Sequence, residues 1–222
     1  MEDELIVTSD GSHTVLSAQF GESYHSRFGA VQESRHIFID AALKFKALQQ
    51  TRIKVLEMGF GTGLNALLTL LESRRKGLEV DYSSVEAYPI SPEQARSLNF
   101  IDILQEPWLG APFSEMHTGP WGQAFSLDEH FVFTKWRSLF EEFAPPSQYD
   151  VIYFDAFAPA AQPELWELPL LGKMYDALLP GGVLTTYCAK GSVKRNLKSL
   201  GFTLESLEGP PGKREMTRAT KG

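Results

Sequence analysis

Residues 55–65 read Val55-Leu56-Glu57-Met58-Gly59-Phe60-Gly61-Thr62-Gly63-Leu64-Asn65, and this stretch decides the fold. It includes the end of a short apolar run, 53–58, that predicts a buried parallel strand. It leads into residues 64–71, whose apolar residues predict a helix. Three glycines therefore occupy a strand-to-helix turn. Because glycine tolerates positive φ and has no side chain, a ligand can press against the backbone there, beside the unpaired N–H groups of the helix N-terminus.

Dinucleotide-binding folds use a similar glycine turn, and the acidic residue Glu57 separates the two possibilities. A carboxylate at the mouth of the loop would repel a pyrophosphate, whereas it would attract the ammonium group of a methionine-type cofactor. The stretch therefore favours S-adenosylmethionine over NAD and disfavours a dehydrogenase. We expect seven residues of this segment at the cofactor: Glu57, Gly59, Phe60, Gly61, Thr62, Gly63 and Asn65.

Length and composition indicate one globular domain. The chain has 222 residues, enough for a sizeable core, and no apolar run reaches the length of a membrane span. The N-terminus, Met1-Glu2-Asp3-Glu4, is acidic where a secretory signal is basic. The single cysteine, Cys188, excludes an intrachain disulfide and a cysteine-only metal cluster. We therefore expect a cytoplasmic protein with no metal, no membrane association and no obligate protein partner.

The charge is unevenly distributed along the chain. The formal net charge is −7, which argues against a nucleic-acid partner. From Lys190 onward, however, eight basic residues stand against three acidic ones, a local balance of +5 that leaves −12 for the rest. Such a basic segment can contact a phosphate backbone, although a solvated helix face with a loose tail explains the same charges.

The first 50 residues predict a layer that precedes the first strand of the nucleotide fold. Residues 5–17 alternate around Ser9-Asp10-Gly11-Ser12, as in a β-hairpin. A polar and aromatic segment, 21–30, precedes residues 32–50, which have helical spacing. We expect residues 1–50 to cover the cofactor site as a lid on a domain formed by residues 51–222.

Residues 78–85 predict a second strand, which ends at Glu86. A carboxylate at this position can accept hydrogen bonds from both ribose hydroxyls. The alternative is a surface acid that happens to end a strand. After it, Ser91-Pro92-Glu93 predicts a helix start, with serine as the cap and proline at the first helical position.

The remaining segments complete an alternation of strands and helices. We expect an irregular insertion or a broken helical excursion over 106–129, a strand over 131–134, a short helix over 136–143 and a helix over 163–179 that stops at Pro180-Gly181-Gly182. A strand over 183–187, a basic helix over 191–200 and a final pair, 201–207 with 215–220, follow. This order predicts a doubly wound, mostly parallel sheet with an antiparallel last strand at its edge.

A second informative stretch is Tyr149-Asp150-Val151-Ile152-Tyr153-Phe154-Asp155-Ala156-Phe157-Ala158-Pro159. Residues 151–154 predict a buried strand, and Asp155 follows at its carboxyl end, where open α/β sheets bind ligands. Asp155 would then lie beside the glycine turn, where it can contact the cofactor and orient an amine. A helix cap or a loop-bracing aspartate is the structural alternative.

Several blocks together resemble the methyltransferase domain of the MnmC family, in the same order and over nearly the whole chain. They are Tyr24-His25-Ser26 with Gly29-Ala30 and Glu33-Ser34, Gly59 to Asn65, Asp155 to Pro159 with Pro163-Glu164-Leu165-Trp166, and Gly209 with Lys213-Arg214-Glu215-Met216. The resemblance implies a Rossmann-like class I fold that uses S-adenosylmethionine and releases S-adenosylhomocysteine. It also implies a tRNA substrate, methylated on the exocyclic amine of 5-aminomethyl-(2-thio)uridine at the wobble position to give 5-methylaminomethyl-(2-thio)uridine.

The bifunctional members of that family also carry an FAD-dependent oxidase domain. This chain ends soon after Met216 and has one glycine-rich nucleotide turn, so it resembles the stand-alone methyltransferase, which does not bind FAD. It departs from the family where a Gly-Asp pair near the adenine is replaced by Lys135-Trp136. We expect Trp136 to stack on the adenine instead.

The resemblance and the residues together give a set of candidate roles. For the transfer itself we expect an in-line displacement in which Asp155, with Tyr24, orients the amine and relays its proton. Tyr24, His25, Ser26 and Phe157 are candidates for holding the unstacked base, although His25 in such a loop is more often a hydrogen-bonded strut. For phosphate contacts in the anticodon arm the candidates are Lys190, Lys194, Arg195, Lys213 and Arg214, of which the last two can instead serve only to tie the final loop to the sheet.

Two other classes of function remain open. A small-molecule amine or carboxylate methyltransferase would keep Glu57, the glycines and Glu86, but would not bind RNA in a salt-sensitive way. A non-catalytic scaffold with a nucleotide fold would not bind S-adenosylmethionine.

Overall fold

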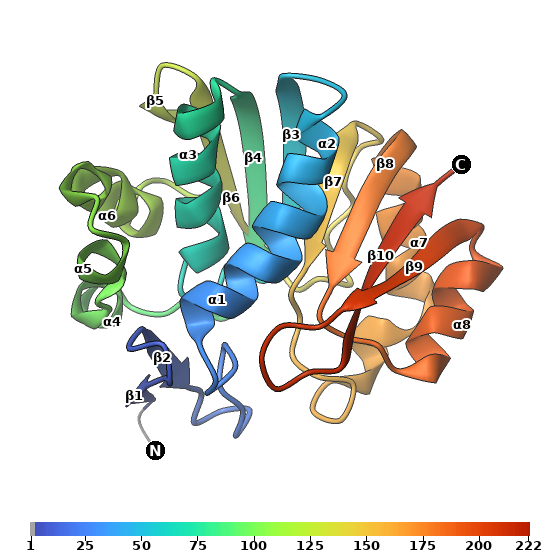
Figure 1. Ribbon diagram of the computed structural model, residues 1–222, viewed down its shortest axis with the longest axis horizontal. Helices are drawn as coiled ribbons and strands as arrows, with labels where there is room; N and C mark the ends of the chain where they lie inside the picture. The colour runs from blue at the N-terminus through green and yellow to red at the C-terminus, as the bar shows by residue number, and fades with distance from the viewer. Residues whose placement is uncertain (1–2) are drawn as a thin grey trace.

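An eight-stranded sheet runs through the centre of the computed structural model, which describes residues 3–222 (Figure 1). Five neighbouring strands are parallel, in the order β6-β4-β3-β7-β8, and the others are antiparallel to their neighbours. Across the sheet the strands are β5 (Phe125–Asp128), β6 (Phe131–Arg137), β4 (Glu79–Glu86), β3 (Arg52–Met58), β7 (Tyr149–Phe154), β8 (Leu178–Thr186), β10 (Glu215–Lys221) and β9 (Phe202–Glu208). The doubly wound fold predicted from the sequence is confirmed.

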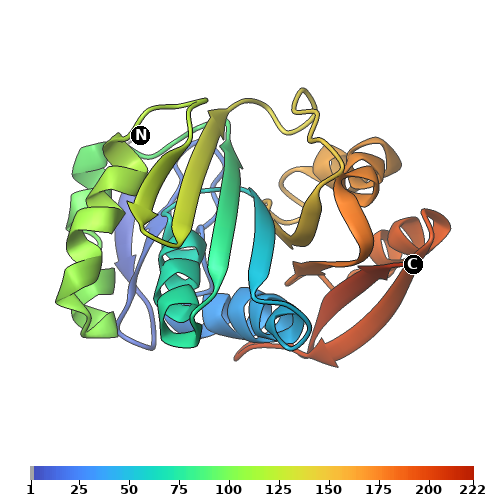
Figure 2. The same cartoon turned by 90° about the horizontal axis from the view of Figure 1, so that it is seen from above.

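Strand β3 is apolar on both sides because helices cover both faces of the sheet. Successive side chains of a strand point to opposite faces. Ile53 and Val55 pack in the core formed with α3 (Leu64–Lys76), whereas Leu56 and Met58 pack in the core formed with α7 (Leu168–Ala177) and α8 (Gly191–Ser199). Figure 2 separates the two layers, with the blue N-terminal helix and α3 on one side and the orange α7 on the other.

The N-terminal layer has the predicted hairpin and helix. Strands β1 (Glu4–Val7) and β2 (His13–Leu16) pair antiparallel. One continuous helix follows, assembled from α1 (Ala30–Ser34), a π-helical stretch (Arg35–Lys44) and α2 (Phe45–Ala47). In Figure 1 the hairpin lies at the end of the sheet formed by the carboxyl ends of the parallel strands. Met1 and Glu2, which contributed to the argument against export, lie outside the described residues.

The helix start predicted at Ser91 is confirmed. Helix α4 (Pro92–Ser97) has Ser91 as its N-cap, and Gln94 completes a reciprocal capping box. Helix α5 (Phe100–Leu104) follows directly. Both helices contribute to the core shared with α3.

Of the two expectations for the segment 106–129, the broken helical excursion is the one observed, and a strand follows it. The segment contains a 3₁₀ turn (Pro107–Leu109), helix α6 (Gly110–Thr118) and the edge strand β5. The end of α6 is held by Lys135, whose fully buried ammonium group donates to the carbonyls of Met116 at 2.8 Å and His117 at 2.7 Å. Lys135 lies 19 and 18 positions after these two residues, so no pattern in the local sequence records the contact.

The short helix predicted over 136–143 is wrong. Strand β6 continues to Arg137, because β4 offers it partners as far as Glu86. Residues 138–143 then form turns, with Phe143 N–H donating to the Leu139 carbonyl. The apolar spacing of this segment reflects a strand end followed by a loop.

Two boundaries near the C-terminus also differ from the prediction. Helix α7 ends at Ala177 and β8 begins at Leu178, so Pro180-Gly181-Gly182 lies within an irregular strand start and does not stop the helix. The last strand, β10, is antiparallel as predicted. It lies between β8 and β9, however, and the edge position belongs to β9. The loop that precedes β10 allows the chain to turn back into the gap next to β8.

Candidate active site

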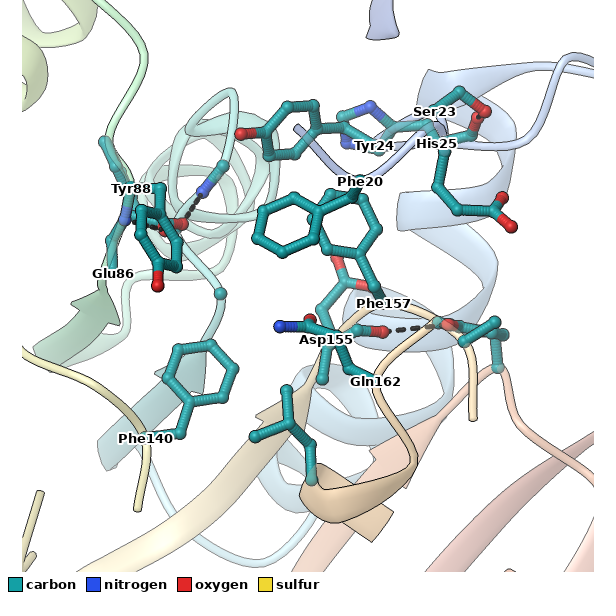
Figure 3. A pocket seen from close by; sticks show the side chains of 18 of the residues that line it. Phe20, Ser23, Tyr24, His25, Glu86, Tyr88, Phe140, Asp155, Phe157 and Gln162 are labelled. Carbon is teal, nitrogen blue, oxygen red and sulfur yellow. Dashed lines mark hydrogen bonds between the residues drawn. The ribbon is translucent and has the colours of Figure 1, made fainter. Parts of the chain in front are cut away.

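A cavity of about 370 Å³ opens at the carboxyl ends of β3, β4 and β7. Its walls include the N-terminal loop 20–26, the glycine loop after β3 and the loops after β4, β6 and β7, together with Tyr187 and Lys213. Figure 3 shows Glu86 and Tyr88 on one side, the rings of Phe20, Tyr24 and Phe157 close together, and Asp155 beside them. The two informative stretches of the sequence thus meet in one pocket.

The three glycines of the loop are required by their backbone and by their neighbours. Gly59, Gly61 and Gly63 have φ of 102°, 50° and 77°, in the region that disfavours side chains. A Cβ on Gly59 would lie 2.6 Å from the Asp155 carbonyl oxygen, and one on Gly61 would lie 2.7 Å from the Tyr24 ring. The loop is therefore a cradle that any side chain would fill, which fits the close approach of a nucleotide cofactor.

Glu86 ends β4 inside the pocket. Its Oε2 accepts from the Gly61 N–H at 2.9 Å and its Oε1 from the Tyr88 N–H at 2.8 Å. Burial raises the pKa of this carboxyl, and these backbone hydrogen bonds oppose the rise. Each carboxylate oxygen keeps accepting capacity beyond the one backbone bond, so Glu86 can receive the two hydroxyls of a ribose.

Asp155 stands at the end of β7 on the pocket wall. Asn65, from the first turn of α3, donates from its Nδ2 to Asp155 Oδ2 at 2.9 Å. Burial raises the pKa of Asp155 to about 7, with the Asn65 hydrogen bond opposing the rise. Within residues 3–222 this is the only hydrogen bond to the carboxylate, so Oδ1 is free to meet a ligand.

Tyr24 and His25 line the pocket in different ways. The Tyr24 ring covers Gly61 and contacts Phe157, with ring centroids 5.3 Å apart. Burial and the charge of Glu86 raise the pKa of its hydroxyl, and in the described part of the chain no hydrogen bond joins it to Asp155. His25 is buried between Thr14 Oγ1 at 3.2 Å and Thr62 Oγ1 at 3.5 Å, and burial lowers its pKa to about 4. It is a strut between the hairpin and the glycine loop.

Ser26 links the N-terminal layer to the C-terminal loop. Its backbone N–H donates to Glu33 Oε2 at 2.7 Å, and Glu33 Oε1 pairs with Lys213 Nζ at 2.5 Å. Lys213 also lies 4.0 Å from the centre of the Tyr187 ring. Lys213, predicted as a phosphate contact, is therefore engaged inside the protein, where its charge lowers the pKa of Asp155.

The other basic candidates divide into two groups. The Lys194 ammonium group pairs with Glu215 at 2.9 Å and donates to Ser206 at 2.8 Å, so it is engaged by residues of the protein itself. Arg195 is exposed on α8. Lys190 and Arg214 line a shallow groove that shares Tyr187 and Lys213 with the main pocket. The groove continues the pocket toward a basic surface.

The predicted contact between Glu57 and the cofactor is not supported by the geometry. Glu57 is fully buried and does not line the cavity. The reason is strand alternation: Glu57 points to the same face as Val55, beneath α3, where Ser84 Oγ donates to its Oε2 at 2.6 Å. Burial raises the pKa of Glu57 to about 8.

The predicted stacking of Trp136 on the adenine is likewise not supported. Trp136 lies within β6, 38% exposed, outside the pocket lining, and packs against Phe143. The wall nearest the glycine loop on that side is Phe140, whose Cζ lies 3.8 Å from the Cβ position of Gly59. Strand β6 runs to Arg137, and the alternation of its side chains places Trp136 outside the pocket.

Sequence reasoning also missed four aromatic residues of the pocket, Phe20, Tyr88, Phe140 and Tyr187. Phe20 contacts Phe157 at 4.8 Å and Tyr88 at 5.5 Å between ring centroids, so it bridges three loops. A weak signal existed for Tyr88, because it lies two residues after Glu86, the predicted acceptor for the ribose hydroxyls. None existed for the other three, because their positions depend on how the loops fold back.

Two classes of site were searched for outside the pocket. Over residues 3–222 no group of three or more His, Cys, Asp or Glu side chains could hold a metal ion. No helix in the same range is long and apolar enough to cross a membrane. Cys188 is buried, and burial raises the pKa of its thiol.

Comparison with known proteins gives a family and several relatives. A family model described as S-adenosyl-L-methionine-dependent methyltransferase matches residues 102–222. The bifunctional tRNA 5-methylaminomethyl-2-thiouridine biosynthesis protein MnmC of Aromatoleum aromaticum is 29% identical over 238 residues, which cover 96% of this chain and 34% of that protein. The MnmC protein of Pseudomonas aeruginosa is 30% identical over 92% of this chain and 33% of its own length. The chain thus spans about a third of the curated relatives it matches.

Solved structures agree with the sequence relatives. The crystal structure of MNMC2 from Aquifex aeolicus superposes with a TM-score of 0.76 at 27% identity, over 98% of this chain and 70% of that one. The magnesium protoporphyrin IX methyltransferase of Synechocystis, solved with bound SAM, has a TM-score of 0.53 at 8% identity, over 87% of this chain and 81% of its own. At that identity the likeness concerns the fold alone.

Proposed function

The chain belongs to the S-adenosyl-L-methionine-dependent methyltransferase family, and from this premise we propose that it methylates the exocyclic amine of 5-aminomethyl-(2-thio)uridine at the tRNA wobble position, giving 5-methylaminomethyl-(2-thio)uridine. Similarity to MnmC proteins along nearly the whole chain supports the choice of substrate. The observation that carries the chemistry is Asp155, a half-buried carboxylate with one free oxygen beside the glycine loop.

The residues of the pocket fit S-adenosylmethionine. Gly59 and Gly61 line the pocket at positions where a Cβ would collide with Asp155 or Tyr24, and Glu86 offers acceptors for ribose hydroxyls. Phe140 can border the adenine base in place of Trp136. When bound there, S-adenosylmethionine supplies an electrophilic methyl group.

Asp155 acts on the substrate amine. An alkylammonium has no lone pair to offer, so the site must present the neutral amine. Asp155 Oδ1 accepts an N–H of that amine and takes up the proton that methylation displaces, while Asn65 holds Oδ2. Most of the acceleration comes from fixing the two reactants in line. The rings of Phe20, Phe157 and Tyr24 provide stacking surfaces for an unstacked base.

The basic groove next to the pocket suits the phosphates of an anticodon arm. Lys190 and Arg214 line it, and Arg195 is exposed on the neighbouring helix α8. Lys194 and Lys213 are paired with Glu215 and Glu33, so they serve the fold. The partner is then a tRNA, and the reaction belongs in the cytoplasm.

The test is a methyl-transfer assay with the purified protein and labelled S-adenosylmethionine. The substrates are tRNA carrying 5-aminomethyluridine, the corresponding anticodon stem-loop and the free nucleoside, and the wobble nucleoside is analysed by mass spectrometry. We expect transfer to the tRNA and stem-loop. Transfer to the nucleoside alone at equal efficiency would point to a small-molecule methyltransferase, and a lack of S-adenosylmethionine binding by calorimetry would point to a scaffold.

A further inference from the structure

Lys213 is the single lysine or arginine that lines the main pocket in residues 3–222. The other charged residues of the wall are acidic: Glu22, Glu33, Glu86, Glu141, Asp155 and Glu164. The ion pair between Lys213 and Glu33 ties the C-terminal loop to α1, but that role does not require the lysine to border the cavity. The position of Lys213 on the wall therefore suits a contact with a ligand.

The Lys213 ammonium group is fixed by a buried carboxylate. Its Nζ pairs with Glu33 Oε1 at 2.5 Å, and Glu33 Oε2 accepts from the Ser26 N–H at 2.7 Å. The backbone of Lys213 closes a turn as well, because its N–H donates to the Pro210 carbonyl at 2.9 Å. An ammonium group held in this way is a preorganised hydrogen-bond donor.

Tyr187 connects this ammonium group to the chain segment that carries Asp155. Lys213 Nζ lies 4.0 Å from the centre of the Tyr187 ring, and the Tyr187 hydroxyl donates to the Ala156 carbonyl at 2.8 Å. Ala156 directly follows Asp155. The charge of Lys213 is also near enough to lower the pKa of Asp155. The cation and the Asp155 carboxylate therefore lie in the same part of the pocket.

The two side chains offer complementary hydrogen-bonding groups. An ammonium group has three N–H donors, and over residues 3–222 Glu33 is the one acceptor with which Lys213 Nζ forms a hydrogen bond. The Tyr187 ring occupies a second direction, which leaves a donor for an acceptor in the cavity. Asp155 keeps Oδ1 as an acceptor, because Asn65 occupies Oδ2. A ligand that fits both must present a donor and an acceptor close together.

The base of the proposed substrate carries such a pair. The amine of 5-aminomethyluracil is attached through one methylene group to C5, and the neighbouring carbon C4 carries O4, a carbonyl acceptor. In cytosine, C4 carries an amino group, which donates instead. C2, where the sulfur of the 2-thio form is attached, is not adjacent to C5. Proteins distinguish unstacked bases by hydrogen bonds of this kind to the edges of the ring.

We propose that Lys213 selects uracil: it donates a hydrogen bond to O4 of the unstacked base while Asp155 accepts an N–H of the amine, and Glu33 positions Lys213 for this contact. The inference rests on the proposed function and specifies how its substrate is recognised. A cytosine in the same place turns an amino group toward the ammonium group, so two donors meet and the contact is lost. The C2 substituent plays no part in it.

The test compares two anticodon stem-loops that differ in the wobble base alone, 5-aminomethyluridine against 5-aminomethylcytidine. For the natural protein we expect kcat/KM to favour the uridine by about a hundredfold or more. In Lys213→Met this preference should fall below about tenfold, with the S-adenosylmethionine Kd changed less than about threefold. Loss of the charge also raises the pKa of Asp155 and slows both substrates, but this effect cancels in the ratio. An unchanged preference in K213M would overturn the proposal.

Lys221→Met is the matched control. Lys221 stands at the other end of β10, with its Nζ 4.6 Å from the centre of the Tyr175 ring, and it donates to the carbonyls of Tyr175 and Leu178, both at 2.8 Å. It does not line the pocket. K221M should lower the melting temperature and keep the preference for uridine. An equal loss of preference in K221M and K213M would count against the contact, because a weakened fold would then explain both.

A change in the substrate tests the same contact if K213M does not fold. Sulfur is a weaker hydrogen-bond acceptor than oxygen, so the natural protein should methylate 5-aminomethyl-4-thiouridine at least about tenfold less efficiently than 5-aminomethyl-2-thiouridine in the same stem-loop. Equal efficiencies would overturn the proposal. Methylation of none of these stem-loops would remove the proposed function and this inference together, whereas methylation with an unchanged uridine preference in K213M would remove the inference alone.

Discussion

At the scale of single residues, the glycine loop depends on space as much as on backbone freedom. Gly61 has φ of 50°, and a Cβ there would lie 2.7 Å from the Tyr24 ring. We expect Gly61→Val to weaken S-adenosylmethionine binding by about a hundredfold or more, because its side chain fills the cradle and displaces Tyr24. Isothermal titration calorimetry measures the change in Kd.

Gly77 provides the matched control. It also has positive φ, 64°, but nothing lies within 4 Å of its Cβ position, and it caps the far end of α3. Gly77→Val introduces a similar backbone strain without touching the pocket, so it should lower stability and leave the Kd nearly unchanged. Equal losses of S-adenosylmethionine affinity in both variants would contradict a specific requirement for glycine at position 61 of the cofactor site.

Asp155 is the residue on which the chemistry depends. Asp155→Asn preserves the shape and removes the charge, so kcat should fall by about 10²-fold or more while cofactor affinity is retained. In the natural protein kcat should rise with pH through about 7, where the carboxyl loses its proton. Stopped-time assays from pH 5.5 to 9 record both effects, and a fully active D155N variant would remove Asp155 from the mechanism.

At the scale of elements, the continuation of β6 to Arg137 decides which aromatic residue borders the cofactor. Phe140, in the loop after β6, lines the pocket, whereas Trp136 does not. We therefore expect Phe140→Ala to raise the S-adenosylmethionine Kd about tenfold. Trp136→Ala, the larger truncation, should change it less than about threefold. Calorimetry on both variants checks the assignment, and the reverse order of effects would restore Trp136 to the site.

The end of α6 illustrates how a side chain from one element fixes another. Lys135 on β6 donates to two carbonyls at the end of α6 and lies 4.5 Å from the centre of the Trp121 ring. Lys135→Met leaves both carbonyls without this donor, which should cost about 1–3 kcal/mol of unfolding free energy. Urea denaturation measures it, with Lys76→Met on the exposed side of α3 as the control. Equal stability of the two variants would show that water replaces the ammonium group.

At the scale of the whole molecule, an acidic body carries a basic rim beside one pocket. The groove that contains Lys190 and Arg214 adjoins the pocket through Tyr187 and Lys213. If tRNA phosphates lie there, a Lys190→Ala and Arg214→Ala double variant should bind tRNA at least about tenfold more weakly and show a shallower dependence of binding on salt. S-adenosylmethionine binding should be unaffected. Filter binding at several salt concentrations tests this, with Lys76→Ala at the distant end of α3 as the control.

The local elements of the fold could be predicted from adjacent residues. A strand-loop-helix unit is specified by residues 53–58, the three glycines and the helix after them. Its signals occur in adjacent residues: an apolar run for a strand buried on both faces, glycines that permit positive φ, and helical spacing. The same holds for Glu86 and Asp155, which follow buried strands and so come to the same edge of a parallel sheet. Their convergence was predictable for this reason.

Only the tertiary structure decided which side chains face the pocket. Strand alternation and the packing of α3 turned Glu57 inward, and the length of its partner β4 drew Trp136 into β6. Lys213 was taken up by Glu33, 180 residues away in the chain, and Phe20 was brought across to Phe157. Contacts between distant segments are set by how whole layers pack, and no local pattern of residues records that packing.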